Sequence, residues 1–500
     1  MNIYPFLSNN NIRYYENMEL VPGKLRKQRV PLLREGYFLT PSVPWEQRID
    51  NGYPNVFYDE DYEEYRCYYT CCIRDDASTV KRPEDRVHDE YNFHRRDLFR
   101  RRVSGILLAT SKDGLNWTRP DLGVCEFDGH THTNIILADI HGASVFKDRH
   151  DPDPSRRYKM VVRHDAHEKM AVSYSADGIK WCEPIDWPDY NPAGDTHNFA
   201  FWDEESGKYV LITRTWGKDQ LRLCARCESD DFLHWSVPVE IYRGDSIEDQ
   251  LYSMPVFKRG EVYYGLGSFF HDGDRRSENF DCVDCELMYS TDSVHWNRVS
   301  RGKPFIPRSM GKYGDNVPDS CCIYASAPVE RDGKYEFFYF GGSGQHTNFR
   351  ESTLMCATVD ADELAGYAPR NGKDGTLTSG AVYFEGDELY IKADVCENGS
   401  LKVMISDVYG IQAPMAPIKG FGFDDCRLEK AGDDLWKVTF PTSLKNLGGD
   451  GTTAGSANEG IWPSSLGALG SDRRCMIVMA ADNATLYGFG GDVVPARLRK

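Results

Sequence analysis

Acidic residues recur at matching places along this chain, just before one strand-like apolar run or just after the next. Those with a candidate catalytic role are Asp50, Asp195 and Asp249. Cleavage of a glycosidic bond uses two carboxyl groups: one protonates the leaving oxygen, and the other attacks the anomeric carbon or activates water. These residues therefore fit glycoside cleavage, provided that the fold brings them together.

Other residues at equivalent places are of the types that hold a sugar. Aromatic rings stack on sugar faces, and polar side chains bind hydroxyl groups. A single Asp before a strand is most often a turn residue, so the recurrence carries the argument. The candidate substrate-binding residues are Trp45, Arg48, Asn51, His141, Arg163, His197, Arg214, Glu248, Tyr252, His271, Asp319 and His346.

A seven-residue pattern, S-x-D-x-x-x-W, indicates how the chain positions these residues. It occurs at 111–117, 175–181, 229–235 and 290–296. Repeats of strand-like sequence at intervals of about 50 to 65 residues are typical of β-propeller blades. We interpret the pattern itself as structural, because its Asp and Ser side chains can satisfy turn amides while its Trp packs between strands.

Each copy follows two strand-like runs joined by a turn. The first runs of the modules begin at 55, 143, 199 and 254, and a fifth begins at 326 with a degenerate closing repeat around 357–367. In a propeller, the start of the first strand and the end of the second strand of every blade surround one axial pocket. The fold would thus gather the candidate residues there.

We therefore predict an all-β protein, a five-bladed β-propeller followed by a C-terminal β-sandwich. Residues 45–370 hold the five modules and form the catalytic domain. Residues 1–44 are expected to be an N-terminal extension that packs on the propeller. Residues 371–500 read as short strands with glycine turns, a pattern typical of an antiparallel sandwich.

One motif resembles a known catalytic family. Trp45 followed by Asp50-Asn51-Gly52 is similar, with altered spacing, to the tryptophan-containing N-D-P-N-G motif that carries the nucleophile of glycoside hydrolase family 32. The chain resembles the five-bladed propellers of families 32 and 43, and most of all uncharacterised bacterial relatives of family 32. The resemblance implies that Asp50 is the nucleophile and that a β-sandwich follows the propeller.

The other two motifs of that family are altered. Asp195-Thr196 takes the place of the E-C motif, so the resemblance implies a general acid shortened to Asp. The R-D-P motif that stabilises the transition state is replaced by His141-Gly142-Ala143, so His141 or Asp139 would substitute. The identity of the acid stays open between Asp195 and two residues of the fourth module, Glu248 and Asp249.

The composition argues against nucleic acid and membranes as partners of this protein. The formal net charge of −18 argues against nucleic acid, because phosphate binding needs a basic face. The chain has no run of 18 apolar residues and no secretory signal within residues 1–11, so no membrane association is expected. An odd number of cysteines, 15, indicates free thiols in a reducing cytoplasm.

No metal or cofactor is expected. The two CxxC pairs, Cys224/Cys227 and Cys282/Cys285, lie in strand-like runs, where residues three apart point to opposite faces.

Three functions remain in competition. The first is a glycosidase that removes a terminal sugar, such as a furanoside, from a small glycan, with Asp50 as nucleophile or base and Asp195 or Asp249 as acid. The second is a carbohydrate-binding propeller without hydrolytic power, motivated by the lost R-D-P motif. The third is an interaction propeller, against which the density of polar residues speaks. The oligomeric state cannot be inferred from the sequence.

Overall fold

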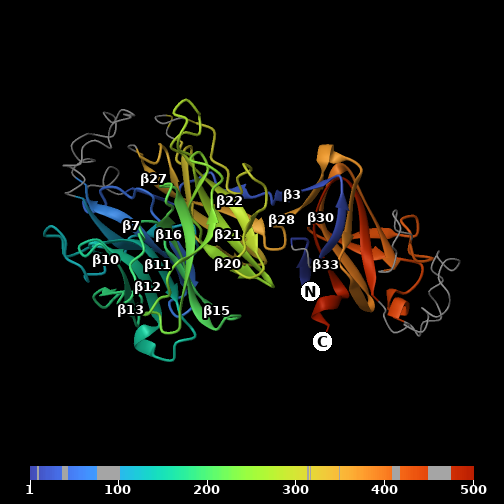
Figure 1. Ribbon diagram of the computed structural model, residues 1–500, viewed down its shortest axis with the longest axis horizontal. Coiled ribbons are helices and arrows are strands. Elements are labelled where there is room, and N and C mark those ends of the chain that lie inside the picture. The colour runs from blue at the N-terminus through green and yellow to red at the C-terminus, as the bar shows by residue number, and fades with distance from the viewer. Residues whose placement is uncertain are drawn as a thin grey trace. The chain divides into compact units, whose positions relative to one another are not determined.

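The computed structural model describes residues 1–7, 11–35, 43–75, 102–311, 315, 317–347, 350–407, 417–448 and 474–499. The chain folds into two compact units, one formed by Met1–Lys24 with Asp360–Lys500 and the other by Leu25–Val359 (Figure 1). The described residues are nearly all in strands and loops, which confirms the all-β prediction. Their helices are single 3-10 turns, and none of them is long and apolar enough to cross a membrane.

The larger unit begins with three antiparallel sheets in chain order. The first contains β6 (Asn55–Asp59), β7 (Glu64–Arg74), β8 (Val103–Ser111), β9 (Trp117–Thr118) and β10 (Ile135–Ala138). The second contains β11 (Ile140–Lys147), β12 (Tyr158–His164), β13 (Lys169–Ser175) and β14 (Ile185–Asp186). The third contains β15 (Phe199–Asp203), β16 (Lys208–Trp216), β17 (Arg222–Ser229) and β18 (Val239–Arg243).

The remaining strands of this unit share an 11-stranded sheet. Its first part contains β19 (Gln250–Ser253), β20 (Val256–Arg259), β21 (Val262–Phe270), β22 (Val283–Ser290) and β23 (Asn297–Arg298). Its second part contains β24 (Cys322–Ala325), β25 (Val329–Arg331), β26 (Lys334–Gly342) and β27 (Ser352–Asp360), with the short strands β4 (Arg26–Lys27) and β5 (Leu33–Arg34) paired to β27. The parts join only where Val283 lies opposite Cys322.

Apolar side chains pack each set of strands against the next. Residues of β7 and β8 share a core with β11 and β12, those of β12 and β13 with β16, and those of β16 with β20–β22. Phe257 and Phe305 then contact Tyr335 and Phe337 of β26. Finally, β26 and β27 pack against β6 and β7, so the last strands cover the first sheet.

The four S-x-D-x-x-x-W copies form the same turn. In the copy at 229–235, the Asp231 carboxylate accepts hydrogen bonds from the amides of Leu233 and His234, and the Trp235 indole donates to the carbonyl of Phe232. Equivalent bonds occur at Asp113, Asp177 and Asp292. The structural interpretation of the pattern is therefore confirmed.

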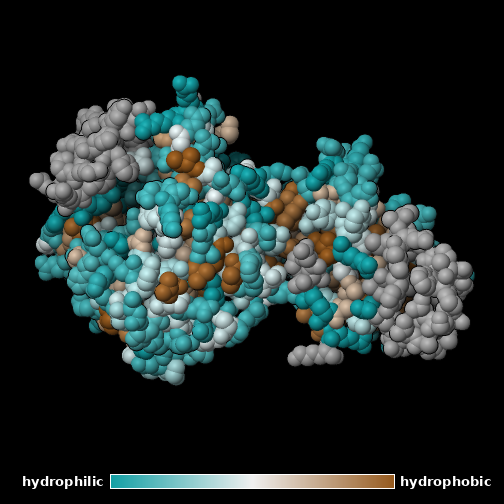
Figure 2. Space-filling model, viewed as in Figure 1, coloured by the Kyte–Doolittle hydropathy of each residue, from teal (hydrophilic) through white to brown (hydrophobic). Residues whose placement is uncertain are grey.

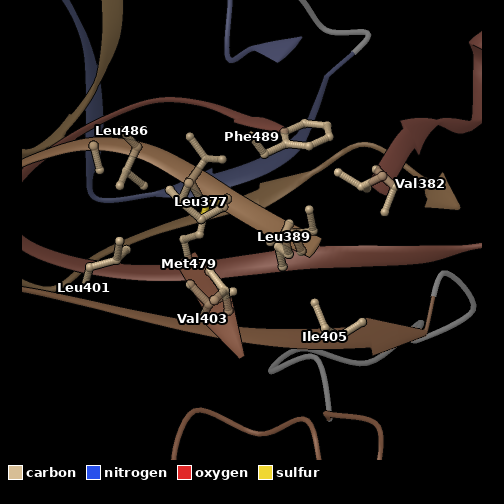
Figure 3. Packing of buried hydrophobic residues seen from close by; sticks show 14 of the residues in the cluster. Leu377, Val382, Leu389, Leu401, Val403, Ile405, Met479, Leu486 and Phe489 are labelled. Atoms are coloured by element: carbon tan, nitrogen blue, oxygen red, sulfur yellow. The ribbon is translucent and has the colours of Figure 1, made fainter. Parts of the chain in front are cut away.

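The smaller unit is a nine-stranded sheet around one apolar core. Its long strands are β30 (Val382–Asp407) and β33 (Cys475–Pro495), in which Leu389 lies opposite Gly491 and Asp407 opposite Cys475. Leu389, Met479 and their neighbours fill the core between the strands (Figure 3). The other strands are β1 (Ile3–Pro5), β2 (Ile12–Glu16), β3 (Met18–Pro22), β28 (Ala365–Pro369), β29 (Gly375–Ser379), β31 (Arg427–Gly432) and β32 (Leu435–Thr439).

The division of the chain differs from the predicted boundaries 1–44, 45–370 and 371–500. The first 24 residues belong to the smaller unit, because β1 pairs with β33, β2 with β29 and β3 with β28. The larger unit ends at Val359 instead of near 370. Short strands that complete the edge of a distant sheet leave no local signal of their partner.

The structure also shows the state of the cysteines and the polarity of one face of the molecule. All 15 cysteines lie among the described residues, and no disulfide bond joins any of them there. Cys224 packs with β21 and β22 residues on one side of its sheet, while Cys227 packs with Trp235 on the other, so this CxxC pair does not converge. The face shown in Figure 2 is mostly hydrophilic, with apolar side chains in small patches.

The repeated turn generates a stability prediction. Replacing Asp231 by Ala should lower the free energy of unfolding by about 1–3 kcal/mol, because two turn amides lose their acceptor. Urea denaturation of the purified protein measures this loss. The neighbouring Asp230→Ala variant is the control, since the Asp230 side chain is 84% exposed and should change stability by less than about 0.5 kcal/mol. Equal stability of both variants would show that the turn bonds contribute nothing.

Candidate active site

Polar side chains from all five sets of strands meet in the larger unit. They come from the segments before β6, β15 and β27, from the starts of β11 and β17, from within β19 and β24, and from the ends of β12, β16 and β26 or the residues that follow them. We call this group the central polar cluster. Its members are Arg48, Asp50, Asn51, Tyr53, His141, Arg163, Asp165, Asp195, His197, Arg214, Arg222, Tyr252, Tyr324, His346 and Arg350.

Asp50 is held by two guanidinium groups. Its Oδ1 lies 2.9 Å from Arg48 Nη2 and 2.6 Å from Arg350 Nη2. Among the described residues, no side chain or amide donates a hydrogen bond to its Oδ2. The Asp50 side chain is 27% exposed and its backbone has a φ of 61°, which a non-glycine residue seldom adopts. One oxygen is thus fixed while the other is available to a ligand.

Two tyrosines connect Asp50 with the rest of the cluster. Arg350 also donates to the amide oxygen of Asn51, and Asn51 donates to the Tyr53 hydroxyl over 2.7 Å. The hydroxyls of Tyr53 and Tyr252 lie 2.6 Å apart. The Arg214 guanidinium lies 4.9 Å from the centre of the Tyr252 ring. This buried chain of contacts leads from the segment before β6 to β16.

Asp195 lies at the other end of that chain. Its Oδ2 is 2.9 Å from Arg214 Nη2, and its Oδ1 is 3.2 Å from His141 Nε2. The other ring nitrogen of His141 is 2.5 Å from Asp165 Oδ1. The Asp195 side chain is 62% exposed although its carboxylate contacts two cations, so solvent or a ligand can reach this end of the cluster.

A close approach of two backbone segments brings His141 to Asp195. Gly142 has a φ of 63°, and a Cβ there would lie only 2.1 Å from the carbonyl oxygen of Thr196. The Asn198 side chain donates to the carbonyls of Gly142 and Gly194, over 2.7 and 2.9 Å. Gly142 therefore lets β11 lie against the segment that carries Asp195.

The surrounding charges determine which of these groups is ionised at neutral pH and which carries a proton. Burial alone would raise the pKa of Asp50, but Arg350 and Arg48 hold the pKa of this carboxyl well below its usual range. Burial likewise opposes ionisation of Asp195, yet Arg214 and His141 hold its pKa far below normal. Burial opposes the charged form of His141, but its bonds to Asp165 and Asp195 raise the pKa of His141 to about 9. At neutral pH the dissociable proton of this group therefore resides on the imidazole.

Two histidines of the cluster are neutral. Burial lowers the pKa of His197 to about 3, and the ring stacks on Tyr53 with no partner for its Nε2. Burial and the nearby Arg350 lower the pKa of His346 well below its usual value, and its Nδ1 lies 2.7 Å from the Tyr324 hydroxyl. A neutral imidazole with a free nitrogen can bind a hydroxyl group.

Two arginines of the cluster have no carboxylate partner among the described residues. Arg163 donates to the carbonyl of Ala193 over 2.6 Å, and its charge acts on Asp195. Arg222 donates to the Gln250 side chain over 3.1 Å, and its guanidinium lies 5.0 Å from the ring centre of Trp216, which is 44% exposed. Burial lowers the pKa of Arg222, as expected for a cation without a compensating anion.

The structure brings ten of the fifteen predicted site residues into the cluster: Arg48, Asp50, Asn51, His141, Arg163, Asp195, His197, Arg214, Tyr252 and His346.

The other five lie elsewhere. The Trp45 indole donates to Asn134, and Asp319 is buried beside Lys27 and Tyr339. Asp249 pairs with Arg298 over 2.6 Å, in a separate buried ion-pair group. Its carboxylate is therefore already neutralised within the protein.

The remaining two of these five lie next to each other. His271 bonds the carbonyl of Glu248 and the carboxylate of Asp284. The Glu248 residue is exposed. Neither contact involves a residue of the central polar cluster.

Sequence reasoning missed five members of the cluster. Tyr53 and Tyr324 resemble the many other aromatic residues of the chain, and Arg222 begins β17 instead of ending a second strand. Arg350 follows β26 at a distance, just before β27. Asp165 follows β12 at a place where the recurrence predicts site residues, so the same signal could have found it.

Comparison with known proteins leaves the family open. No protein-family model and no curated protein matches the chain. Solved structures that resemble it include a glycosyl hydrolase from Bacteroides ovatus, at 16% identity and a TM-score of 0.43, covering 68% of this chain and 94% of that one. Another is a β-1,2-mannobiose phosphorylase from Listeria innocua, at 13% identity and a TM-score of 0.43, covering 73% of this chain and 98% of that one.

A third is the α-L-arabinofuranosidase from Podospora anserina, at 12% identity and a TM-score of 0.44, covering 68% of this chain and 97% of that one. Likenesses this weak do not decide between families, so the resemblance to family 32 stays a prediction.

The charge of His141 can be measured directly. In the folded protein its imidazole should titrate near pH 9, above the ordinary value of about 6.5, and Asp165→Asn should move the titration toward that value. The stability that this raised pKa contributes is complete below about pH 6.5 and is lost as the pH rises through about 9. NMR of histidine side chains labelled with 15N reports the titration. His197, neutral through this range, is the internal control, and titration of His141 below pH 7 would contradict the assignment.

Proposed function

We propose that the larger unit is a five-bladed β-propeller and the smaller unit a β-sandwich. The packing of each set of strands on the next, and of β26 and β27 on β6 and β7, supports a closed ring of five blades. The central polar cluster would then line the axis. Most of its members come from equivalent places in the blades, at or near a first strand or the end of a second; Arg222 and Arg350 are the exceptions.

The cluster best supports hydrolysis of a glycosidic bond at a terminal sugar. One observation supports this proposal most strongly. Asp50 is an ionised carboxylate whose Oδ2 accepts no hydrogen bond from the described residues, and His141 carries a proton beside Asp195. One chain of contacts joins these two groups. Glycoside cleavage needs an ionised carboxylate and a proton donor on either side of the scissile bond. Both kinds of group are present here in the required protonation state.

Each residue then has a role. Asp50 acts as nucleophile or activates water through Oδ2, while Arg48 and Arg350 keep it ionised and oriented. Arg214 keeps Asp195 ionised, so the proton for the leaving oxygen comes from His141 Nε2, and Asp165 stabilises the imidazolium. This replaces the expected carboxylic acid by a histidine, since a carboxyl paired with Arg214 does not retain a proton at neutral pH.

The charge of the cluster favours an acidic sugar. Arg163 and Arg222 form no ion pair with a carboxylate of the described residues, and both side chains are only half-buried, so a ligand can reach them. A carboxylate, sulfate or phosphate on the substrate would pair with them, and the exposed Trp216 beside Arg222 offers a face for the sugar ring.

One observation favours a second function, sugar binding without cleavage. Both carboxylates of the cluster are paired with arginines, and such pairs also serve to hold a ligand in place. In this case the protein would bind an acidic sugar and release it unchanged.

Catalysis by Asp50 is tested by the near-isosteric Asp50→Asn variant. Its kcat/KM on a panel of aryl glycosides should fall by about 10²- to 10⁴-fold, because the ionised oxygen is lost. The exposed Asp230→Asn variant is the control for purification and folding. Full activity of Asp50→Asn would remove the assignment, whereas binding of sugars by calorimetry with no cleavage by the wild type would establish the second function.

The preference for an acidic sugar is tested at Arg222. Arg222→Gln should lower kcat/KM about 10- to 100-fold for aryl glycosides of acidic sugars, since a charged hydrogen bond is lost, and change it little for neutral ones. Arg243→Gln removes an exposed arginine paired with Glu240 and serves as the control. An equal loss of kcat/KM on acidic and neutral substrates would show that Arg222 does not recognise the negative charge of the sugar.

A further inference from the structure

A second cluster of ionisable side chains lies on the sheet of β11–β14. His164 ends β12, His167 lies in the turn between β12 and β13, and Asp186 ends β14. His164 Nδ1 is 3.1 Å from Asp186 Oδ1, and His167 Nδ1 is 2.8 Å from Asp186 Oδ2. The ligand atoms of the three residues all lie within 4.8 Å of one another, and no other such group of three occurs among the described residues.

The spacing of these atoms matches that of ligands around a small metal ion. Metal–nitrogen and metal–oxygen distances of about 2.0–2.2 Å place neighbouring ligand atoms about 3 Å apart in tetrahedral or octahedral geometry. Imidazole and carboxylate are the ligands that zinc and related divalent ions take. The three side chains leave further positions open, because His167 is 54% exposed and solvent reaches the group.

The other histidines in the described part of the chain do not offer this arrangement. His132 contacts Asp121 and His234 contacts Asp231, each as a single imidazole facing one carboxylate. At His141 the two carboxylates contact opposite ring nitrogens, so they cannot chelate one ion together. Here, in contrast, two imidazoles whose ring centres are 3.9 Å apart face the same carboxylate.

We propose that His164, His167 and Asp186 bind one divalent transition-metal ion of the zinc class. The site forms only in the folded protein. His164 and His167 are three residues apart, but Asp186 reaches them through the pairing of β13 with β14, in which Ala171 lies opposite Asp186.

The ion would fix the turn between β12 and β13 to β14. That turn begins with Asp165, whose carboxylate contacts His141 of the central polar cluster. Binding of the metal would therefore order the residue that orients His141, while the ion itself stays outside the cluster. The site does not depend on the proposed function, since it is defined by its own three ligands.

The experiment uses the whole protein, stripped of metal with a chelator and then titrated with zinc chloride by isothermal calorimetry. We expect one zinc ion per chain, and an affinity reduced at least tenfold in both His167→Ala and Asp186→Asn. His132→Ala is the matched control, because it removes an exposed histidine that also contacts a single aspartate, and it should bind zinc like the wild type. His167 lies in an exposed turn, so its variant is expected to fold.

A second measurement uses the thermal midpoint of unfolding. Zinc should raise it in the wild type and in His132→Ala and leave it unchanged in His167→Ala. The proposal is overturned if the wild type takes up no zinc, or if His167→Ala binds zinc as tightly as the wild type. In either case the three side chains form only a hydrogen-bonded group in which both imidazoles donate to Asp186.

Discussion

The central polar cluster depends on the compensation of buried arginines by carboxylates. Arg350 is fully buried, and its charge is tolerable only because Asp50 lies 2.6 Å away. The same holds for Arg214 and Asp195 at the other end. Each ion pair holds a guanidinium group in place, and that guanidinium contacts the side chains around it. The positive charge also keeps the paired carboxylate ionised. Loss of one partner would leave a buried charge alone, which is far more costly than the pair itself.

This constraint also explains why the proton resides on a histidine. A carboxyl group can serve as an acid only if its surroundings favour the neutral form, and an arginine at 2.9 Å does the opposite for Asp195. His141 takes the proton because it lies between two carboxylates, Asp165 and Asp195. The imidazole can lie there because Gly142 permits the close approach of β11 to the segment that carries Asp195.

Much of this could be predicted from the sequence, because repetition is a strong signal. The four S-x-D-x-x-x-W copies defined the strand modules, and their recurrence pointed to Asp50, His141, Asp195 and Arg214. The signal fails for residues outside the recurrence, such as Arg350 and Tyr53. The signal also selects residues that lie at the expected place but whose side chains bind a different partner. Asp249, for example, forms an ion pair with Arg298 outside the cluster. Position along a strand predicts the location of a residue, but not which partner its side chain will choose.

The division of the chain has a consequence for how the protein is made. The smaller unit is discontinuous: its sheet contains β1–β3 from the first 24 residues and β28–β33 from the last 141, and the larger unit is inserted between them. On the ribosome, the first three strands emerge more than 300 residues before their partners. The inserted unit can complete its own core during that time, whereas the discontinuous unit can assemble only after its second segment has been made. Its unpaired early strands are then the part of the nascent chain most exposed to wrong pairing.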